Sequence, residues 1–271
     1  MSDKKVIVWN NQQIYAHGEI IKKIKFVVKN MRGVFPLYGK ERQILKEYAT
    51  QHGISKYVMF SLRNIVKIQK EINASKFIKA NTPDIKNNFV KNINQFIIHN
   101  KKLEYFLISC KIPLVHLFRI LESMNEYTNL SQENLDYIAN IKQTIKTQEQ
   151  NTFRRSLEFE HLLESYLKDN GLNFKTEDDI RNSGDYILTP DILFDEPIVI
   201  KIDDITYTIK WMDAKNYILI NTPFIIKSLT KQAEKYYHTF GLGAFVFHYG
   251  FDDSIKIPYC IILDGSTLEK S

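Results

Sequence analysis

The segment from Ile205 to Lys215 alternates residue types with the period of a β-strand and ends in an acid and a base. Successive side chains of a strand point to opposite faces of a sheet, so every second residue shares a face. One face therefore carries Ile205, Tyr207, Ile209, Trp211, Asp213 and Lys215. We expect a largely apolar strand face that opens toward solvent where Asp213 and Lys215 lie.

The residues after about 150 predict an α/β domain around this strand. An amphipathic helix is expected from Arg154 to Asn170, where Gly171 ends it. Further strands are expected over 172–174, 186–194, 205–214, 244–249 and 255–263, with another helix over 222–239. We expect a mixed central sheet flanked by helices in a domain spanning residues 150–271.

The first half of the chain predicts an all-helical domain over residues 1–145, because Pro is sparse and apolar residues recur three and four positions apart. Residues 44–68 are expected to form two short helices around a tight turn at Gly53, as in a helix-turn-helix. Residues 103–124 predict a second such unit. A plain helical bundle would produce the same corners, and this alternative stays open.

A polar stretch over residues 143–151 is the expected domain boundary, or else the exposed end of a connecting helix. Charge also changes there. Residues 1–150 carry 24 Lys and Arg against 12 Asp and Glu, whereas residues 151–271 carry 13 against 19. A basic module attracts nucleic acid through its phosphates, although a single lysine is more often part of a solvated surface.

The second helix of the first helix-turn-helix unit is expected to expose basic side chains. These are Lys56, Arg63 and Lys67. In a helix-turn-helix the second helix contacts nucleic acid, so we expect these three residues to bind it.

Three carboxylates of the second half are candidates for a metal site. Glu160 falls in the apolar stripe of its helix, where a charge is costly unless it is paired or bound to metal. Asp191 follows Pro190, which removes a ladder hydrogen bond and turns the carboxylate out of the sheet. A salt bridge for Glu160 and an ordinary turn at Asp191 are the alternatives. With Asp213 and Lys215 they form the residue set of a metal-dependent phosphodiesterase.

These residues resemble the PD-(D/E)xK nuclease superfamily and, within it, the TPD-motif group. The similar stretch runs from about Phe159 to Phe251 and contains Thr189-Pro190-Asp191, Trp211-Met212-Asp213-Ala214-Lys215, Gln232 and Phe240-Gly241-Leu242-Gly243. The resemblance implies a restriction-endonuclease-like core and paired helix-turn-helix units. It also implies that Asp191 is the central metal ligand and that Gln232 supports the site. Asp213-Ala214 stands where the group more often has Glu and Ser.

We therefore expect hydrolysis of phosphodiester bonds in nucleic acid, with DNA as the expected substrate. Mg²⁺ or Mn²⁺ would be held by Glu160, Asp191, Asp213 and the carbonyl of Ala214, and Lys215 would position the attacking water. The alternative is a catalytically inactive nucleic-acid-binding or scaffold protein of the same fold, acting through a protein partner. The animal nuclease of the TPD-motif group associates with codanin in the nucleus, so the resemblance also implies a codanin-like partner.

The chain is expected to be intracellular, either nuclear or cytoplasmic, and neither secreted nor bound to a membrane. No stretch is long and apolar enough to span a bilayer. Its first residues lack the apolar run and the cleavage site of a signal peptide.

Overall fold

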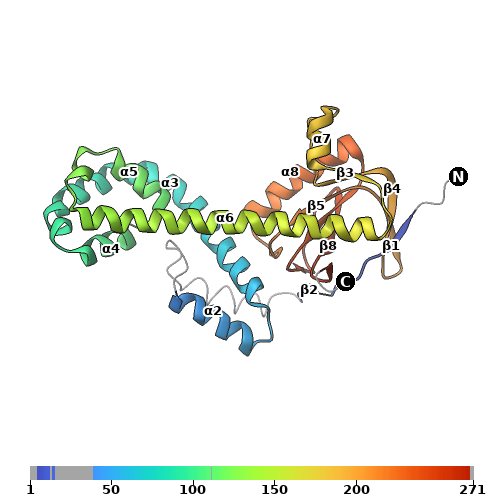
Figure 1. Cartoon of the computed structure of the whole chain (residues 1–271), viewed down its shortest axis with the longest axis horizontal. Coiled ribbons are helices and arrows are strands. Elements are labelled where there is room, and N and C mark those ends of the chain that lie inside the picture. Colours follow the sequence, from blue (N-terminus) through green and yellow to red (C-terminus); the bar gives the residue numbers. More distant parts are fainter. Residues whose placement is uncertain (1–4, 13, 16–38, 111, 269–271) are drawn as a thin grey trace. The chain divides into compact units, whose positions relative to one another are not determined.

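The computed structural model describes residues 5–12, 14–15, 39–110 and 112–268 (Figure 1). The fold is α+β with a mixed central sheet. The chain divides into two compact units, and each is described by itself. We call residues 1–23 together with 153–271 the sheet unit, and residues 24–152 the helical unit.

The sheet unit is built around a mixed sheet. Its elements are β1 (Val6–Val8), β2 (Ile14–Tyr15), the second half of α6 (Gln132–Asp169), β3 (Phe174–Thr176), α7 (Glu177–Ser183), β4 (Ile192–Ile202), β5 (Ile205–Lys215), α8 (Pro223–Phe240), β6 (Gly243–Phe247), β7 (Phe251–Asp252) and β8 (Cys260–Asp264). The strand order is β1-β4-β5-β6-β8, and β3 pairs with the first residues of β4. The β3–β4 and β4–β5 pairs are antiparallel, whereas β1–β4, β5–β6 and β6–β8 are parallel.

The first residues of the chain belong to this sheet, so the expectation of helices from residue 1 is wrong. The strand β1 pairs with β4 through Val6, Ile7 and Val8. Trp9 anchors it further, because its indole Nε1 donates to the carbonyl of Asp264 over 2.9 Å. Three consecutive β-branched residues favour a strand. The scarcity of Pro, on which the helical prediction was based, does not distinguish a strand from a helix.

The strand predicted over 186–194 is also wrong in its bounds, since β4 begins at Ile192 and ends at Ile202. The residues Asp195-Glu196-Pro197 interrupt the apolar pattern and look like a turn. In the structure the register to β5 shifts between Leu193 and Ile198, which is a bulge or irregularity. Bulges accommodate Pro within a strand, and β4 therefore continues through this interruption.

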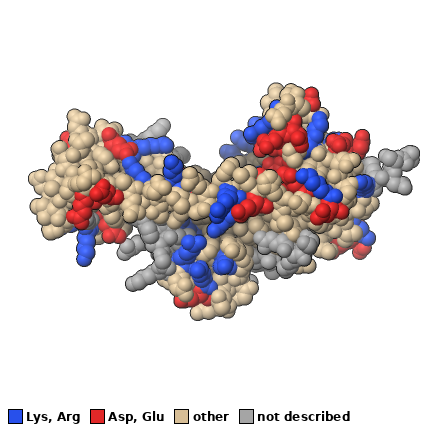
Figure 2. All heavy atoms as spheres, in the orientation of Figure 1, with Lys and Arg blue, Asp and Glu red and all other residues tan. Residues whose placement is uncertain are grey.

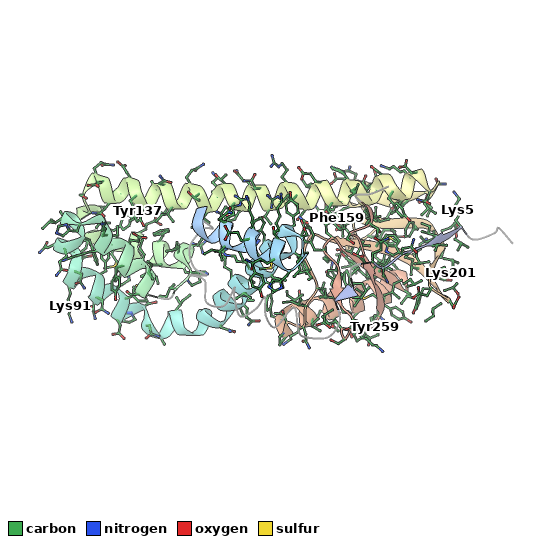
Figure 3. All side chains as sticks on the ribbon, turned by 90° about the horizontal axis from the view of Figure 1, so that it is seen from below. Lys5, Lys91, Tyr137, Phe159, Lys201 and Tyr259 are labelled. Atoms are coloured by element: carbon green, nitrogen blue, oxygen red, sulfur yellow. The ribbon has the colours of Figure 1, made fainter. Side chains whose placement is uncertain are left out.

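The two faces of β5 pack against different helices. Met212 belongs to a core cluster with Phe159, Leu163 and Leu167 of α6, three residues that recur every four positions along the helix. Figure 3 labels Phe159 on this helix. On the opposite face Trp211 contacts Tyr236 of α8 edge to face, with ring centroids 4.9 Å apart. Because side chains alternate along β5, Asp213 and Lys215 lie on the α8 side.

The helical unit has its own core. Its elements are α2 (Gly39–Gln51), α3 (Lys56–Ile98), α4 (Asn100–Ser109), α5 (Leu114–Glu122), the 3₁₀ turn η1 (Asn125–Asn129) and the first half of α6. The core contains an aromatic group formed by Phe89, Phe96 and Phe106, whose ring centroids lie 5.1 to 5.8 Å apart. Leu103, Leu107 and Leu117 are fully buried beside them.

The first predicted helix-turn-helix unit has the expected corner but not two short helices. The corner lies at Gly53, whose φ of +62° is a conformation that favours glycine. Ala49 is buried, and its carbonyl accepts from the amide of Ile54 over 2.9 Å. The second helix, α3, is 43 residues long and continues through Pro83. In the second unit, α4 and α5 form as predicted, with Pro113 as the N-cap of α5.

Arg63 does not lie on an exposed face of α3. Its side chain is only 3% exposed, so the prediction that it is presented to nucleic acid is wrong. Residues 58–63 of α3 are all buried, which means that this stretch of the helix is covered on nearly every side. An amphipathic pattern predicts an exposed face only for a helix that packs against other elements on one side. Lys56 is exposed, and Lys67 is partly exposed.

The predicted boundary at residues 143–151 lies inside α6, which is one continuous helix of 38 residues (Figure 1). The two units divide between Thr152 and Phe153, so the polar stretch is part of a connecting helix and not a loop. The charge difference follows the units. The helical unit has 20 basic and 10 acidic residues, and the sheet unit has 17 and 21. Figure 2 shows acidic side chains gathered over α7. In the described part of the chain, no helix has the length and hydropathy needed to cross a bilayer.

Candidate active site

Asp213 and Lys215 lie at the end of β5, where the apolar strand face gives way to charge. The two side chains form an ion pair between Lys215 Nζ and Asp213 Oδ1. Asp213 is only 4% exposed, and Lys215 is partly buried, with its Nζ lying 5.2 Å from the centre of the Phe245 ring. The expected shared face of Asp213 and Lys215 is therefore confirmed.

Asp191 lies beside them because of the way β4 pairs with β5. Ile192 is the partner of Met212, so the residue before β4 lies next to Asp213 in this antiparallel pair. The Asp191 carboxylate accepts a hydrogen bond from the backbone amide of Ala214 through Oδ2 over 2.7 Å. The Thr189-Pro190-Asp191 motif thus brings a second carboxylate to the end of β5.

Gln232 and Tyr236 of α8 connect the two motifs. Gln232 Nε2 donates to Asp213 Oδ2 over 2.7 Å and lies 3.2 Å from the hydroxyl of Tyr236. The Tyr236 hydroxyl in turn donates to the backbone carbonyl of Thr189 over 3.3 Å. Both oxygens of Asp213 are therefore held, one by Gln232 and one by Lys215.

Glu160 lies farther from the two aspartates. In the ranges that the structure describes, no three His, Cys, Asp or Glu side chains are gathered closely enough to form a metal cluster. Glu160 is partly buried on α6, and burial raises the pKa of its carboxyl, with further increases from the charges of Glu177 and Asp213. The structure thus brings together Asp191, Asp213 and Lys215, while Glu160 acts on them through its charge.

The electrostatic environment at Asp191 disfavours two neighbouring negative charges. Burial, and after it the nearby charge of Asp213, raise the pKa of its carboxyl to about 8, although Lys215 and the Ala214 amide act in the opposite direction. Burial alone would lower the pKa of Lys215, but the neighbouring acidic groups, Asp213 first among them, together outweigh that effect and hold the pKa above its ordinary value. Lys215 therefore stays charged, and Asp191 holds a proton at neutral pH unless another cation replaces it.

Two tyrosines that were not predicted from the sequence also belong to this site. Burial raises the pKa of Tyr217 to about 12 and the pKa of Tyr236 to about 12, so both phenols stay protonated as donors. Tyr217 follows Lys215 by two positions, and continuing the alternation of the strand would have found it. Tyr236 lies one helical turn after Gln232 and therefore on the same helix face, from which it could have been predicted.

The donor set fits a divalent cation. Asp191 and Asp213 offer carboxylate oxygens side by side, which is the kind of ligand that Mg²⁺ prefers. The pKa of Asp191 is raised to about 8 partly because the two carboxylates repel each other. A cation bound between them would remove this repulsion. The backbone carbonyl of Ala214, whose amide contacts Asp191, would be a further oxygen ligand.

The raised pKa of Asp191 predicts how stability depends on pH in the absence of metal. Its ordinary pKa is 3.8 and its pKa in the folded protein is about 8, so the folded state binds more protons than the unfolded state between these values. The free energy of unfolding from this group is therefore greatest below pH 4 and falls as pH rises toward 8. In EDTA we expect the Tm to fall over this range by several degrees more than in Asp191→Asn.

Thermal melts of both proteins between pH 5 and 8, with EDTA or Mg²⁺, measure this difference. Mg²⁺ should raise the Tm of the wild type more at pH 8 than at pH 6, because the cation must displace the proton. Asp195→Asn is the matched control, since Asp195 is exposed on β4. Parallel pH profiles for the wild type and Asp191→Asn would contradict the assignment of the buried proton to Asp191.

Two comparisons place this chain among known proteins. Residues 127–266 match the family model described as "Protein of unknown function TPD sequence-motif". A protein of Acanthamoeba polyphaga mimivirus, named "Uncharacterized protein L539", is 39% identical over 268 residues, which cover 98% of each chain. No solved structure matches the chain significantly. The family match includes Asp191, Asp213 and Lys215, and the chain therefore belongs to the TPD sequence-motif family.

Proposed function

We propose that this protein is a metal-dependent nuclease that hydrolyses phosphodiester bonds of nucleic acid, with DNA as the expected substrate. The observation that carries the proposal is the pairing of β4 with β5, which sets Asp191 beside Asp213 while Lys215 is bound to Asp213. A buried carboxylate, a half-buried carboxylate and an ammonium are costly to place side by side, which supports a functional role for them. They match the needs of phosphodiester hydrolysis.

Each residue of the site has a role in this chemistry. Asp191, Asp213 and the carbonyl of Ala214 would hold Mg²⁺ or Mn²⁺, which when bound polarises the scissile phosphate and lowers the pKa of water. Lys215 holds the attacking water and stabilises negative charge that develops on the phosphate. Gln232 keeps the Asp213 carboxylate in one orientation through its 2.7 Å hydrogen bond. Glu160, on α6, would act on the site through its negative charge.

The finer family relationship is part of the same proposal. We infer membership of the PD-(D/E)xK superfamily with a restriction-endonuclease-like core, because the acids lie on adjacent antiparallel strands of a mixed sheet. The resemblance to the codanin-interacting nuclease of animals adds a codanin-like protein partner and an intracellular location, nuclear or cytoplasmic. The net positive charge of the helical unit supports binding to nucleic acid, with exposed Lys56 and partly exposed Lys67 as phosphate contacts.

The test is cleavage of a labelled panel of single-stranded, duplex and branched DNA and of RNA, with Mg²⁺, Mn²⁺ or EDTA. We expect metal-dependent cleavage that falls roughly 10²- to 10³-fold in Lys215→Ala. Lys210→Ala is the matched control on the other face of β5, where Lys210 Nζ donates to the carbonyl of Asp195 over 2.7 Å. It should cleave like the wild type.

Binding without cleavage under all metal conditions would favour the alternative of an inactive nucleic-acid-binding or scaffold protein. Cleavage that persists in Lys215→Ala at the rate of Lys210→Ala would place the active site elsewhere. Either result would overturn the assignment of these residues.

Replacing Gln232 by Ala is expected to reduce cleavage less than Lys215→Ala does and to change the metal requirement. Gln232→Ala frees Asp213 Oδ2 without removing a ligand, so we expect cleavage to fall about 10- to 100-fold, with a higher metal concentration needed for half-maximal rate. Lys231→Ala, a neighbouring exposed position on α8, should change neither quantity. Cleavage rates measured across a Mn²⁺ titration separate the two variants. An unchanged metal requirement in Gln232→Ala would contradict this role.

A further inference from the structure

A groove of about 660 Å³ lies in the helical unit, between one face of α3 and one face of α4. On α3 its lining residues include Asn81, Asn88, Asn92 and Gln95, which recur at helical spacing. On α4 they include Lys101, Lys102, Tyr105 and Ser109. All of them lie within one unit, so the groove is independent of how the two units are placed.

The groove has two chemically different ends. A single residue, His99, separates α3 from α4, and Lys102 Nζ donates to Gln95 Oε1 over 3.2 Å near this connection. Positive charge is therefore concentrated at the connected end, where Lys101 also lies. Asp84 belongs to the lining about three turns before Gln95 on α3, where its carboxylate can accept hydrogen bonds from amino groups.

The floor and one wall of the groove are aromatic. Phe96 and Phe106 are buried in the core and reach the lining from beneath. Tyr105 is 74% exposed, which is unusual for a large aromatic side chain and leaves its ring open to a ligand. An exposed ring beside side-chain amides provides a surface on which a planar group can stack while its edge forms hydrogen bonds.

Side-chain amides give this groove a particular ligand chemistry. Each Asn or Gln presents a donor and an acceptor side by side, and these match the donor and acceptor pairs on the Watson–Crick edges of nucleobases. Asn88 and Gln95 are exposed, and Asn92 is partly exposed. In a duplex those base edges are already paired and cannot reach such side chains. Recognition of the Watson–Crick edge by these amides therefore requires an unpaired base.

We propose that the groove between α3 and α4 binds single-stranded nucleic acid, with a base stacked on Tyr105, base edges bound by the amides of α3, and phosphate held by Lys101 and Lys102. A groove of 660 Å³ has room for one or two nucleotides. The inference deepens the proposed nuclease function by naming an unpaired strand as part of the substrate. Binding in the groove itself requires neither the metal nor cleavage.

The test is binding of a fluorescein-labelled single strand of roughly 12 nucleotides, measured by fluorescence anisotropy in EDTA so that no cleavage occurs. DNA and RNA strands of one sequence are compared, with the matching duplex as a third probe. Tyr105→Ala should weaken binding of the single strand about 10-fold or more, and Tyr105→Phe should keep it, because stacking needs only the ring. Lys101→Ala with Lys102→Ala should lower the salt dependence as well as the affinity.

Lys91→Ala is the control, since Lys91 is an exposed lysine of α3 outside the groove lining (Figure 3). It should bind like the wild type. A cross-link from 5-iodouracil in the strand to Tyr105 would support the site directly. Equal affinity for the duplex, or wild-type binding by Tyr105→Ala, would overturn the proposal. Because these measurements are made in EDTA, a failure here is distinct from a failure of the nuclease assay.

Discussion

Replacing Asp191 by Asn is expected to abolish metal-dependent cleavage, with a loss of about a thousandfold, while leaving the protein folded. The amide keeps the size of the carboxylate and can still accept from the Ala214 amide, a bond of 2.7 Å in the structure. It loses the negative charge that holds a divalent cation. Single-turnover cleavage and calorimetric titration with Mn²⁺ measure the two consequences together.

The variant should also be more stable than the wild type in EDTA at pH 8. Burial raises the pKa of Asp191 to about 8, so the carboxylate is costly there when no cation is bound, and the neutral amide removes that cost. A gain in stability together with a loss of activity is typical of a functional site. Asp195→Asn, at an exposed position of β4, should alter neither property. Asp191→Asn that binds Mn²⁺ and cleaves normally would exclude Asp191 as a ligand.

Gly243→Ala should strongly destabilise the sheet unit. A Cβ at Gly243 would lie 2.1 Å from two ring atoms of Trp211, far inside van der Waals contact. Trp211 cannot move aside, because it is fully buried and its Nε1 donates to the carbonyl of Gly241 over 3.0 Å. We expect a loss of about 3 kcal/mol, seen as a Tm lower by roughly 10 °C.

Gly184→Ala is the control for the glycine replacement itself. A Cβ at Gly184 meets nothing within 4 Å, and only its φ of +69° is unfavourable, so about 1 kcal/mol should be lost. Combining Gly243→Ala with Trp211→Phe should restore part of the stability, since a smaller ring makes room. Additive losses in the double variant would show that the clash with Trp211 is not the cause.

The local chemistry of the site could be predicted from the sequence because it follows from short-range patterns. Strand alternation sets Asp213 and Lys215 on one face, and the ion pair between them confirms it. The position of Gly53 in a tight corner also follows from its backbone freedom, seen in its φ of +62°. In each case the residues that decide the outcome are neighbours along the chain.

Other features depend on residues far apart in the sequence and could not be predicted in this way. Arg63 is buried because the stretch of α3 from residue 58 to residue 63 is covered on nearly all sides. The segment Val6–Val8 becomes a strand because β4 offers an edge almost 200 positions later. The residue pattern of a short segment does not reveal which distant strand it will pair with.

The sequence by itself determined the residues of the candidate site: the acids Asp191 and Asp213, the base Lys215, and the strand that presents two of them. Their charges and spacing are local properties of the chain. Tertiary structure decided how they meet, since only the antiparallel register of β4 with β5 brings Asp191 to the Ala214 amide. Packing against α8 then adds Gln232 and Tyr236, and it leaves Glu160 outside the group of side chains in contact. Register and packing arise from burial across the whole unit, which no single segment encodes.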